Sequence, residues 1–205
     1  MENSEDFVLY LKDCNNIAKP IYVDFTEYND VSNELIKACG VNKKDKINVL
    51  DCTAGLCRDS FILANNNCDV VAVEKNKVVY ALLQDGFERG YRNENIKKVL
   101  DNIRLINDDS VNFLRTTENM FDCIYLDPMF DKSKKSRLVK KEMQFFHNLI
   151  EESNDKQELF YLAFEWVKNR VVVKRPLHSD FLVNDIKVSF QVKGKTIRYD
   201  VYVKC

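Results

Sequence analysis

The chain has 205 residues, 45% of them hydrophobic, with only five Gly and three Pro, which excludes a disordered polypeptide and allows one domain with a sizeable core. Its net charge of −1 gives no overall attraction to nucleic acid or to a membrane surface, so any such affinity must come from a local patch. The acidic start is unlike a signal peptide, no apolar run approaches the ~20 residues of a membrane helix, and the seven Cys lack zinc-site spacing, so we expect a cytoplasmic protein with reduced thiols.

The first 40 residues are predicted to form an acidic N-terminal extension that packs on the main sheet. Within it, residues 20–25 (PIYVDF) predict a short strand, and residues 32–39 predict a helix that ends at Gly40. No linker, internal repeat or low-complexity segment divides the chain, so we expect residues 1–205 to form a single domain whose core spans 41–205.

Residues 47–61 (INVLDCTAGLCRDSF) predict a strand, a tight turn and the start of a helix. An apolar run ends in Asp51, small residues including Gly55 follow, and a helical pattern begins at about Arg58. This order is typical of the first unit of a doubly wound α/β sheet, in which ligands bind beyond the carboxyl ends of the strands. A single glycine in such a turn can also do no more than close the turn.

The rest of the chain alternates predicted strands and helices. Further strands are expected at residues 69–74, 103–106, 121–126 and 170–174, and helices at 76–91, 96–100, just after 107–110, around 138–150 and at 159–166. Residues 189–192 and 199–203 predict a closing antiparallel hairpin with its turn at 193–195. The pattern therefore predicts an α/β fold with a mixed, mostly parallel seven-stranded sheet and helices on both faces.

Polar residues follow four of these strands. They are Asp51, Glu74, Asp109 with Ser110, and Asp127. The carboxyl ends of parallel strands meet at one edge of a sheet, so we expect one crevice lined by these side chains. Glu74 comes about 20 residues after the glycine turn, where such folds use a carboxylate to bind ribose hydroxyls. Asp109 and Ser110 also suit a helix N-cap, and Arg58 and Asp59 suit the first turn of a helix.

The sharpest chemical signal is Asp127-Pro128-Met129-Phe130, after the fourth strand. It resembles the signature of methyltransferases that modify base amino groups, with Met129 in place of the usual third-position Pro. An exocyclic amine is a poor nucleophile because its lone pair is delocalised into the ring. A carboxylate and a backbone carbonyl can accept its two hydrogens, and an aromatic ring can stack on the base. The alternative is a strand-end Asp before a turn proline.

Three other chemistries lack their residues. No Cys follows Pro128 to attack a base carbon, the two His lack metal-site spacing, and the glycine turn is not a GKS or GKT phosphate loop. Residues 131–142 instead carry six basic residues against two acids, beside the proposed catalytic turn. We expect this patch to bind nucleic-acid phosphates, although such a run can also be a solvated helix face. The predicted substrate contacts are Lys132, Lys134, Lys135, Arg137, Lys140, Lys141, Lys174 and Arg175.

Taken together, the motifs resemble the RsmJ-type family of class I, Rossmann-like methyltransferases, which use S-adenosylmethionine to methylate the N2 amine of a guanine in bacterial 16S ribosomal RNA. The resemblance is carried by VDF (23–25), LDCTAGLCRDSF (50–61), ALLQDGFERGY (81–91), YLDPMF (125–130), KSRLVKKEM (135–143) and RVVVKRP (170–176). It implies cofactor contacts at Arg58, Asp59, Glu74, Lys75, Asp109, Ser110 and Asp127, with Asp51 and Gly55 expected beside them. It implies 16S rRNA or the small ribosomal subunit as partner, without a metal or a membrane.

Two departures from the family pattern stand out. Cys57 occupies the place of a second glycine, and only TEYND separates the VDF segment from the next helix, where the family usually has a Gly- and Arg-rich stretch. Two rival interpretations stay open beside rRNA guanine-N2 methylation. One is an amino-methyltransferase for another RNA or DNA base, and the other is a non-catalytic RNA-binding module with a vestigial Rossmann site.

Overall fold

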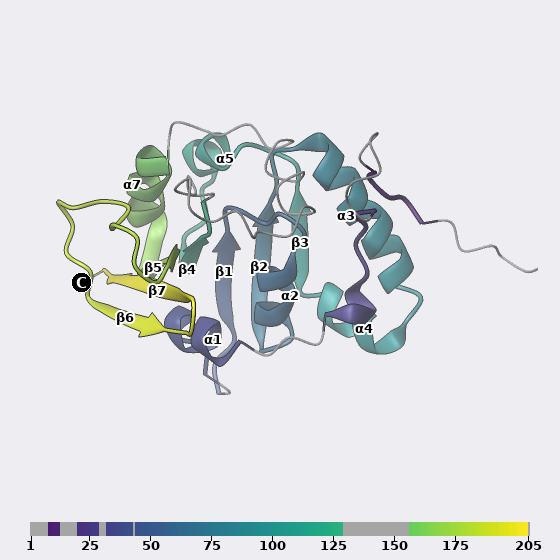
Figure 1. Cartoon of the computed structure of the whole chain (residues 1–205), viewed down its shortest axis with the longest axis horizontal. Coiled ribbons are helices and arrows are strands. Elements are labelled where there is room, and N and C mark those ends of the chain that lie inside the picture. Colours follow the sequence, from purple (N-terminus) through teal and green to yellow (C-terminus); the bar gives the residue numbers. More distant parts are fainter. Residues whose placement is uncertain (1–7, 13–19, 29–31, 43, 129–155, 205) are drawn as a thin grey trace, which may run out of the picture.

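The computed structural model describes residues 8–12, 20–28, 32–42, 44–128 and 156–204. Its centre is a seven-stranded sheet in the order β3-β2-β1-β4-β5-β7-β6 (Figure 1). The strands are β1 (Ile47–Asp51), β2 (Cys68–Val73), β3 (Ile103–Ile106), β4 (Phe121–Leu126), β5 (Val167–Pro176), β6 (Phe190–Lys193) and β7 (Ile197–Val203). The first five strands are parallel, and β7 runs antiparallel between β5 and β6. The predicted mixed, mostly parallel sheet is confirmed.

Helices cover both faces of the sheet. The described helices are η1 (Phe25–Glu27), α1 (Asn33–Cys39), α2 (Arg58–Ala64), α3 (Lys77–Gly90), α4 (Glu94–Leu100), α5 (Ser110–Thr116) and α7 (Lys156–Trp166). One buried cluster holds Phe61 of α2 and Leu83 of α3, and the other holds Leu114 of α5 and Phe160 of α7. Strand residues alternate between the two, so Val172 faces the first cluster while its neighbours face the second. Among the described residues, no helix is long and apolar enough to cross a membrane.

Most predicted elements lie where the sequence indicates, to within a few residues. The strand predicted at 170–174 is longer, because β5 extends in both directions and pairs with β7 up to Pro176. The helix predicted at 32–39 has Ser32 as its N-cap, which accepts a hydrogen bond from the Leu35 N–H at 3.2 Å. Gly40 ends it with φ +73°, and a Cβ there would lie 2.5 Å from the Arg170 guanidinium carbon. The helix expected around 138–150 lies outside the described residues.

The strand predicted at residues 20–25 is wrong. Ile21 forms only an isolated bridge to Leu11, and the chain turns into the 3-10 helix η1 at Phe25. The Asp24 carboxylate causes the turn because it accepts hydrogen bonds from the Thr26 N–H at 2.9 Å and hydroxyl at 2.6 Å. The alternating burial that suggested a strand is still present, since Ile21, Val23 and Phe25 all join the core.

The N-terminal segments pack on both sides of the first core cluster. Phe25 stacks on Phe61 of α2 with ring centroids 5.3 Å apart, and it meets Phe87 of α3 edge-on. Helix α1 lies instead against β5, β6 and β7. The single-domain organisation over 1–205 stays a prediction.

Candidate active site

The polar residues that follow β1, β2, β3 and β4 do gather at one edge of the sheet. Backbone hydrogen bonds beyond the strands hold the turn after β1 between its neighbours. The Cys52 N–H donates to the Tyr125 carbonyl of β4 at 3.0 Å, and the Ala54 N–H donates to the Val73 carbonyl of β2 at 3.1 Å. The Glu74 N–H in turn donates to the Ile106 carbonyl of β3 at 2.9 Å. The expected convergence is therefore built by the parallel ladder itself.

The glycine loop between β1 and α2 contains two left-handed residues. Gly55 has φ +53° and Cys57 has φ +57°. A Cβ at Gly55 would meet nothing closer than 3.8 Å, so backbone conformation and not crowding favours glycine there. Cys57 adopts the conformation in which the family pattern has a glycine, and its side chain is buried in the first core cluster. The thiol is thus packed inside the protein and not in the loop's outer face.

Glu74 ties the end of β2 to the glycine loop. One carboxylate oxygen accepts a hydrogen bond from the Gly55 N–H at 2.9 Å, and the other accepts one from the Asn76 N–H at 2.7 Å. The side chain is only 6% exposed, and burial raises its pKa although these two N–H groups lower it in part. Each oxygen still has a further lone pair that can accept a hydroxyl.

Asp51 is the most buried acid of this edge, at 1% exposure. Its carboxylate accepts hydrogen bonds from the Ser60 hydroxyl at 2.5 Å and from the Thr53 N–H at 3.0 Å. Burial raises the pKa of Asp51 to about 7, which these hydrogen bonds only partly counteract. Asp51 therefore connects the end of β1 to the loop at Thr53 and to α2 at Ser60.

Asp109 and Ser110 are a helix cap, as the sequence allowed. The Asp109 carboxylate accepts a hydrogen bond from the Val111 N–H at 2.9 Å. The Ser110 hydroxyl is buried and donates to the Cys52 carbonyl at 2.6 Å, which fastens the start of α5 to the turn after β1. Lys75 is exposed next to Glu74. The capping role and a position at the edge coexist here.

Arg58 lies at the start of α2 against the N-terminal part of the chain. Its guanidinium carbon is 4.5 Å from the centroid of the Tyr28 ring, in a cation–π arrangement. The Tyr28 hydroxyl donates to the Leu56 carbonyl of the glycine loop at 2.8 Å. Tyr28 was not among the residues expected at this edge, because nothing in the local sequence pattern connects it with the loop.

The β4 and β5 ends carry a cluster of four polar side chains. The Lys174 ammonium lies 2.7 Å from Asp59 Oδ2 and 3.0 Å from Asp127 Oδ2, and the Tyr125 hydroxyl donates to Asp59 Oδ2 at 2.5 Å. Burial alone would lower the pKa of Lys174, but Asp127 and Asp59 together raise it above its usual value. Burial and Asp59 raise the pKa of Tyr125, so its hydroxyl stays protonated and donates. Lys174 is therefore a bridge between two carboxylates.

The backbone of Asp127 is fixed from the glycine loop. Its N–H donates to the Thr53 hydroxyl oxygen at 2.7 Å, and that hydroxyl lies 3.4 Å from Asp51 Oδ1. Burial raises the pKa of Asp127, Lys174 lowers it, and Asp59 raises it, with a net shift above the usual value. Pro128 follows and is buried. Met129 and Phe130 lie outside the described residues.

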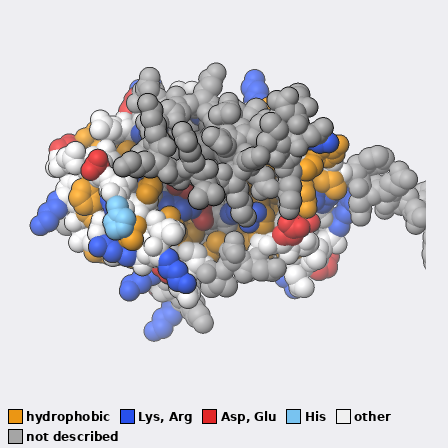
Figure 2. All heavy atoms as spheres, in the orientation of Figure 1, with side chains coloured by type: hydrophobic (Ala, Val, Ile, Leu, Met, Phe, Trp, Pro, Cys, Tyr) orange, Lys and Arg blue, Asp and Glu red, His pale blue; other side chains and the backbone are white. Residues whose placement is uncertain are grey.

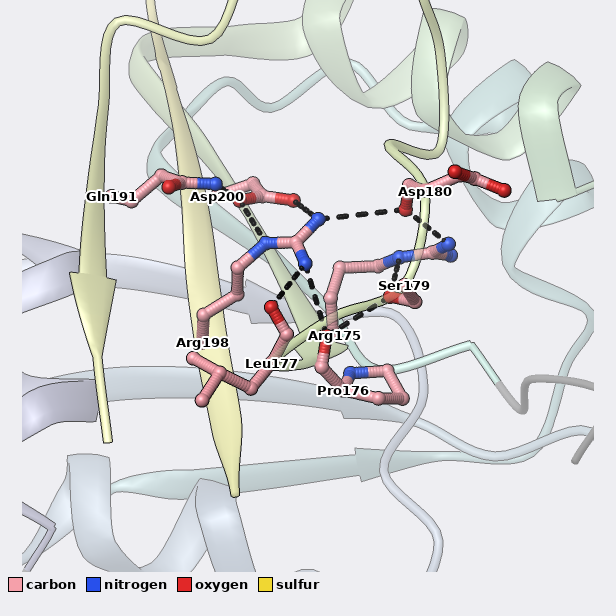
Figure 3. A network of polar contacts seen from close by, with 8 residues as sticks. All are labelled: Arg175, Pro176, Leu177, Ser179, Asp180, Gln191, Arg198 and Asp200. Carbon is pink, nitrogen blue, oxygen red and sulfur yellow. Dashed lines mark hydrogen bonds and ion pairs between the residues drawn. The ribbon is translucent and has the colours of Figure 1, made fainter. Parts of the chain in front are cut away.

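Only two of the eight predicted substrate contacts, Lys174 and Arg175, are among the described residues. Lys132, Lys134, Lys135, Arg137, Lys140 and Lys141 all lie outside the described residues. Lys174 faces the two carboxylates and not the surface. Arg175 points the other way from β5, as alternation requires, and is 7% exposed. Figure 3 shows its guanidinium directed at the loop after β5, where it donates to the Ser179 hydroxyl and the Asp180 carbonyl. The described partners of Arg175 therefore lie within the protein, and its assignment to nucleic-acid phosphates stays a prediction.

Other basic side chains lie toward the β6 edge of the sheet. In Figure 2, Lys and Arg side chains gather at the lower left of the visible face, in the region of β6 and α1. Within the described residues, no group of three or more His, Cys, Asp or Glu side chains could hold a metal ion.

Comparisons with known proteins agree with this geometry. A family model described as "Putative SAM-dependent methyltransferase" matches residues 3–204. The chain is 46% identical over 171 residues to the ribosomal RNA small subunit methyltransferase J of Pseudoalteromonas translucida, covering 83% of this chain and 68% of that protein. It is 36% identical to the protein of that name from Francisella tularensis subsp. novicida, over 97% of this chain and 88% of the relative. This chain belongs to the RsmJ family.

A crystal structure of a SAM-dependent methyltransferase from Neisseria gonorrhoeae has the same fold. It superposes with a TM-score of 0.76 at 30% identity, covering 96% of this chain and 79% of that one. The family membership, the class I methyltransferase fold and S-adenosylmethionine as the cofactor are therefore confirmed. The chain is a methyltransferase, and the interpretation as a vestigial binding module loses its basis.

Proposed function

We propose that this RsmJ family member methylates the exocyclic N2 amine of a guanine in 16S ribosomal RNA, with the small ribosomal subunit or its RNA as partner. The relatives named as small-subunit rRNA methyltransferases, similar to most of this chain, support the substrate class. The choice of an amine is supported by one structural observation above all. A carboxylate followed by a proline ends β4 at the edge of the sheet, braced by the glycine loop on one side and by Lys174 on the other.

The glycine loop and the acids around it suit the cofactor. When bound, S-adenosylmethionine supplies a methyl group on a positively charged sulfonium. Glu74 has spare acceptor capacity on both oxygens for a pair of ribose hydroxyls, beside a loop whose backbone is open at Gly55. Asp127 and its neighbours add negative charge at the same edge, which suits a cationic ligand. Asp51, Arg58, Asp59, Lys75, Asp109 and Ser110 are assigned supporting positions around this site.

Asp127 and Pro128 are assigned to the reacting amine. The Asp127 carboxylate accepts one hydrogen of the amine and the Pro128 carbonyl accepts the other, which draws the nitrogen lone pair out of conjugation. As the nitrogen takes the methyl group and the carbon–sulfur bond of the sulfonium breaks, the nitrogen would become cationic and a neutral thioether would leave. The Asp127 carboxylate would then receive the proton that the nitrogen loses. Phe130 is assigned to stack on the base from sequence alone.

The nucleic-acid contacts rest on the sequence. The basic residues at 132–141 follow the catalytic turn directly, and phosphate binding is their natural role in a chain of nearly neutral charge. Lys174 and Arg175 leave this set, since their partners are carboxylates and backbone groups within the protein.

The decisive experiment compares modified nucleosides in 16S rRNA from cells with and without the gene. Mass spectrometry should show loss of one N2-methylguanosine in the deletion strain, and its return when the purified protein and S-adenosylmethionine are added to that RNA or to intact small subunits. Loss of a different methylated nucleoside would identify another base amine as the target. Unchanged 16S rRNA would refute the proposed substrate.

A further inference from the structure

Lys174 lies near the carboxyl end of β5, and most of its side chain is buried. It follows three buried valines of β5, and its side chain is 22% exposed. Val173 pairs with Leu126, so Lys174 is level with Asp127 on the neighbouring strand. Among the described residues, Lys174 is the only cation within 4 Å of an Asp127 carboxylate oxygen. Its position is that of a partner for Asp127.

We infer that Lys174 is a positioning residue for methyl transfer, which holds the Asp127 carboxylate toward the substrate amine by bridging it to Asp59. This inference rests on the proposed role of Asp127. It assigns to Asp59 and Tyr125 the task of fixing the lysine, in addition to any contact that Asp59 makes with the cofactor.

The bridge completes the fixation of Asp127. Its main chain is held by the hydrogen bond from its N–H to Thr53, but a carboxylate on two rotatable bonds needs a second anchor to keep one orientation. The ammonium at 3.0 Å provides that anchor. Lys174 is itself fixed because Asp59 accepts from it at 2.7 Å while also accepting from the buried Tyr125 hydroxyl. A chain of contacts thus runs from α2 through β5 to the end of β4.

The bridge also favours the ionised form of Asp127. Burial and the negative charge of Asp59 both favour a protonated Asp127, and a protonated carboxyl accepts poorly from an amine. Lys174 counters both. With two carboxylates and one ammonium the cluster carries a single negative charge, which also suits a sulfonium nearby. The other titratable groups facing Asp127 in the described structure are Asp51 on β1, Tyr125 on β4 and Tyr199 on β7.

A phosphate-binding role for Lys174 is the competing view. An ammonium that already lies between two carboxylates would have to leave both to reach an RNA phosphate, and only 22% of the lysine side chain is exposed. The two roles differ in what they change. A phosphate contact sets the KM for RNA and its salt dependence, whereas a positioning contact sets kcat and the pKa of Asp127.

The test uses the full chain with three substitutions and a matched control. Lys174→Met removes the ammonium and Lys174→Arg keeps a cation. Asp59→Asn removes the charge that competes for the lysine. Lys168→Met is the control, because Lys168 lies on the same strand, is 47% exposed and forms only a 3.8 Å ion pair with Asp122. Each protein is checked by thermal melting, and the pKa of Asp127 is followed by carbon-13 NMR of its carboxyl group.

Lys174→Met should raise the pKa of Asp127 by about 1–3 units, and Asp59→Asn should lower it. In methylation assays Lys174→Met should reduce kcat by up to about 100-fold, because a misplacement of about 1 Å at a reacting centre can cost that much, with little change in RNA KM. Its acidic pH limb should move to higher pH, and Lys174→Arg should restore both properties in part. Lys168→Met should change neither.

An unchanged Asp127 pKa in Lys174→Met, or a raised RNA KM with normal kcat, would overturn the positioning role. The NMR titration needs no substrate, so it stands even where the proposed rRNA substrate fails. If Lys174→Met does not fold, the opposite shift in Asp59→Asn and the retained pKa in Lys174→Arg carry the test.

Discussion

The carboxyl edge of the sheet has two halves, and their carboxylates have different kinds of hydrogen-bond donors. The glycine-loop half consists of Asp51, Gly55, Glu74, Asp109 and Ser110 and follows β1, β2 and β3. Its carboxylates accept hydrogen bonds from backbone N–H groups and from the hydroxyls of Ser60 and Thr53. The lysine half consists of Asp59, Tyr125, Asp127 and Lys174, and here one ammonium serves two carboxylates. Hydrogen bonds from neutral donors shape the first half, and a charge pair shapes the second.

The difference lies also in the distance along the chain. Glu74 reaches back 19 residues to Gly55, and Asp51 reaches forward nine residues to Ser60. Lys174 reaches across 115 residues to Asp59, and Tyr125 across 66. The first half is built by one strand-turn-helix unit and its neighbour. The second exists only once α2, β4 and β5 have come together, so it depends on contacts between residues that are distant in the sequence.

The largest effect is expected for Asp51, a buried carboxylate of the glycine-loop half whose donors are all neutral. Its pKa of about 7 in the folded chain exceeds the usual 3.8, so protonation favours the folded state. Stability from this group is fully present below about pH 4 and is lost as the pH rises through 7, on the order of 4 kcal/mol in total. Asp51→Asn keeps an acceptor for Thr53 and removes the charge.

Melting curves of Asp51→Asn and wild type should therefore converge near pH 4 and separate as the pH rises, with the variant more stable at pH 8. Ser60 offers a matched check, because Ser60→Ala removes one hydrogen bond to Asp51 but leaves its charge. Parallel pH profiles of wild type and Asp51→Asn would show that Asp51 is not the buried charge described here.

Asp127 tests the lysine half. Asp127→Ala should lower kcat for rRNA methylation by about 10²–10³-fold, the cost typical of removing one preorganised group at a reacting centre. RNA binding should be nearly unchanged, and cofactor affinity should be measured separately because Asp127 is also a proposed cofactor contact. Asp122→Ala is the matched control, since Asp122 lies on the same strand and contacts Asn48 and Lys168. Near-normal turnover at saturating cofactor would remove Asp127 from the mechanism.

How far the sequence predicts this molecule follows the same division. The glycine-loop half was predicted residue by residue, because an apolar run, an acid and a small-residue turn lie together in the chain and each has a local meaning. Ser110 was expected both as a cap and as a site residue, and its hydroxyl does fasten α5 to the loop. Local pattern is enough when the partners are local.

The lysine half was only partly predicted. Asp127 was found from its motif, but Lys174 was assigned to RNA because a run of basic residues does not reveal a carboxylate 115 residues away. One signal was available. A lysine that follows a run of buried valines is itself partly buried and needs an acidic partner. The Asp at the end of the neighbouring strand can be that partner. The partners of Arg175 could not be predicted for a related reason, since alternation sends it to the opposite face, where it donates to Ser179 and to the Asp180 carbonyl.

The strand predicted at 20–25 failed for a third reason. Period-2 burial of Ile21, Val23 and Phe25 is real, but a strand also needs a partner with unsatisfied backbone groups. Among the described residues only Leu11 supplies one, and the Val23 carbonyl accepts from the Arg89 guanidinium instead. Burial periodicity indicates which side chains face the core, but it does not indicate whether another strand hydrogen-bonds to the backbone.

Glu74 tests the glycine-loop half. Glu74→Ala should weaken S-adenosylmethionine binding by roughly 10- to 150-fold, equivalent to about 1.5–3 kcal/mol for a lost hydrogen bond to a charged group. Calorimetry measures it, with melting temperature as the check on the Gly55 contact. Asp69→Ala is the matched control, because Asp69 lies on the same strand and is half exposed in an ion pair with Lys46. An unchanged dissociation constant in folded Glu74→Ala would exclude the proposed ribose contact.

Thr53 contacts both halves, and its substitution should give the smallest effect. Its hydroxyl oxygen accepts from the Asp127 N–H, while its N–H and hydroxyl both face Asp51. Thr53→Val keeps the shape and the N–H but leaves the Asp127 N–H without this acceptor. We expect kcat to fall by about fivefold, equivalent to about 1 kcal/mol, with S-adenosylmethionine affinity nearly unchanged because Asp51 keeps its other donors. Thr53→Ser should behave as wild type.

Two double-mutant cycles then decide whether the halves act separately. If Thr53 works through Asp127, Thr53→Val should have no further effect on kcat in an Asp127→Ala background, because the group it positions is gone. Combined with Glu74→Ala its effect should add in full, since Glu74 is held by Gly55 and Asn76 and shares no hydrogen bond with Thr53. Two outcomes would contradict this view: additivity with Asp127→Ala, or strong coupling with Glu74→Ala. Either would mean that the loop moves as one unit. The division into two halves would then describe the contacts but not the energetics.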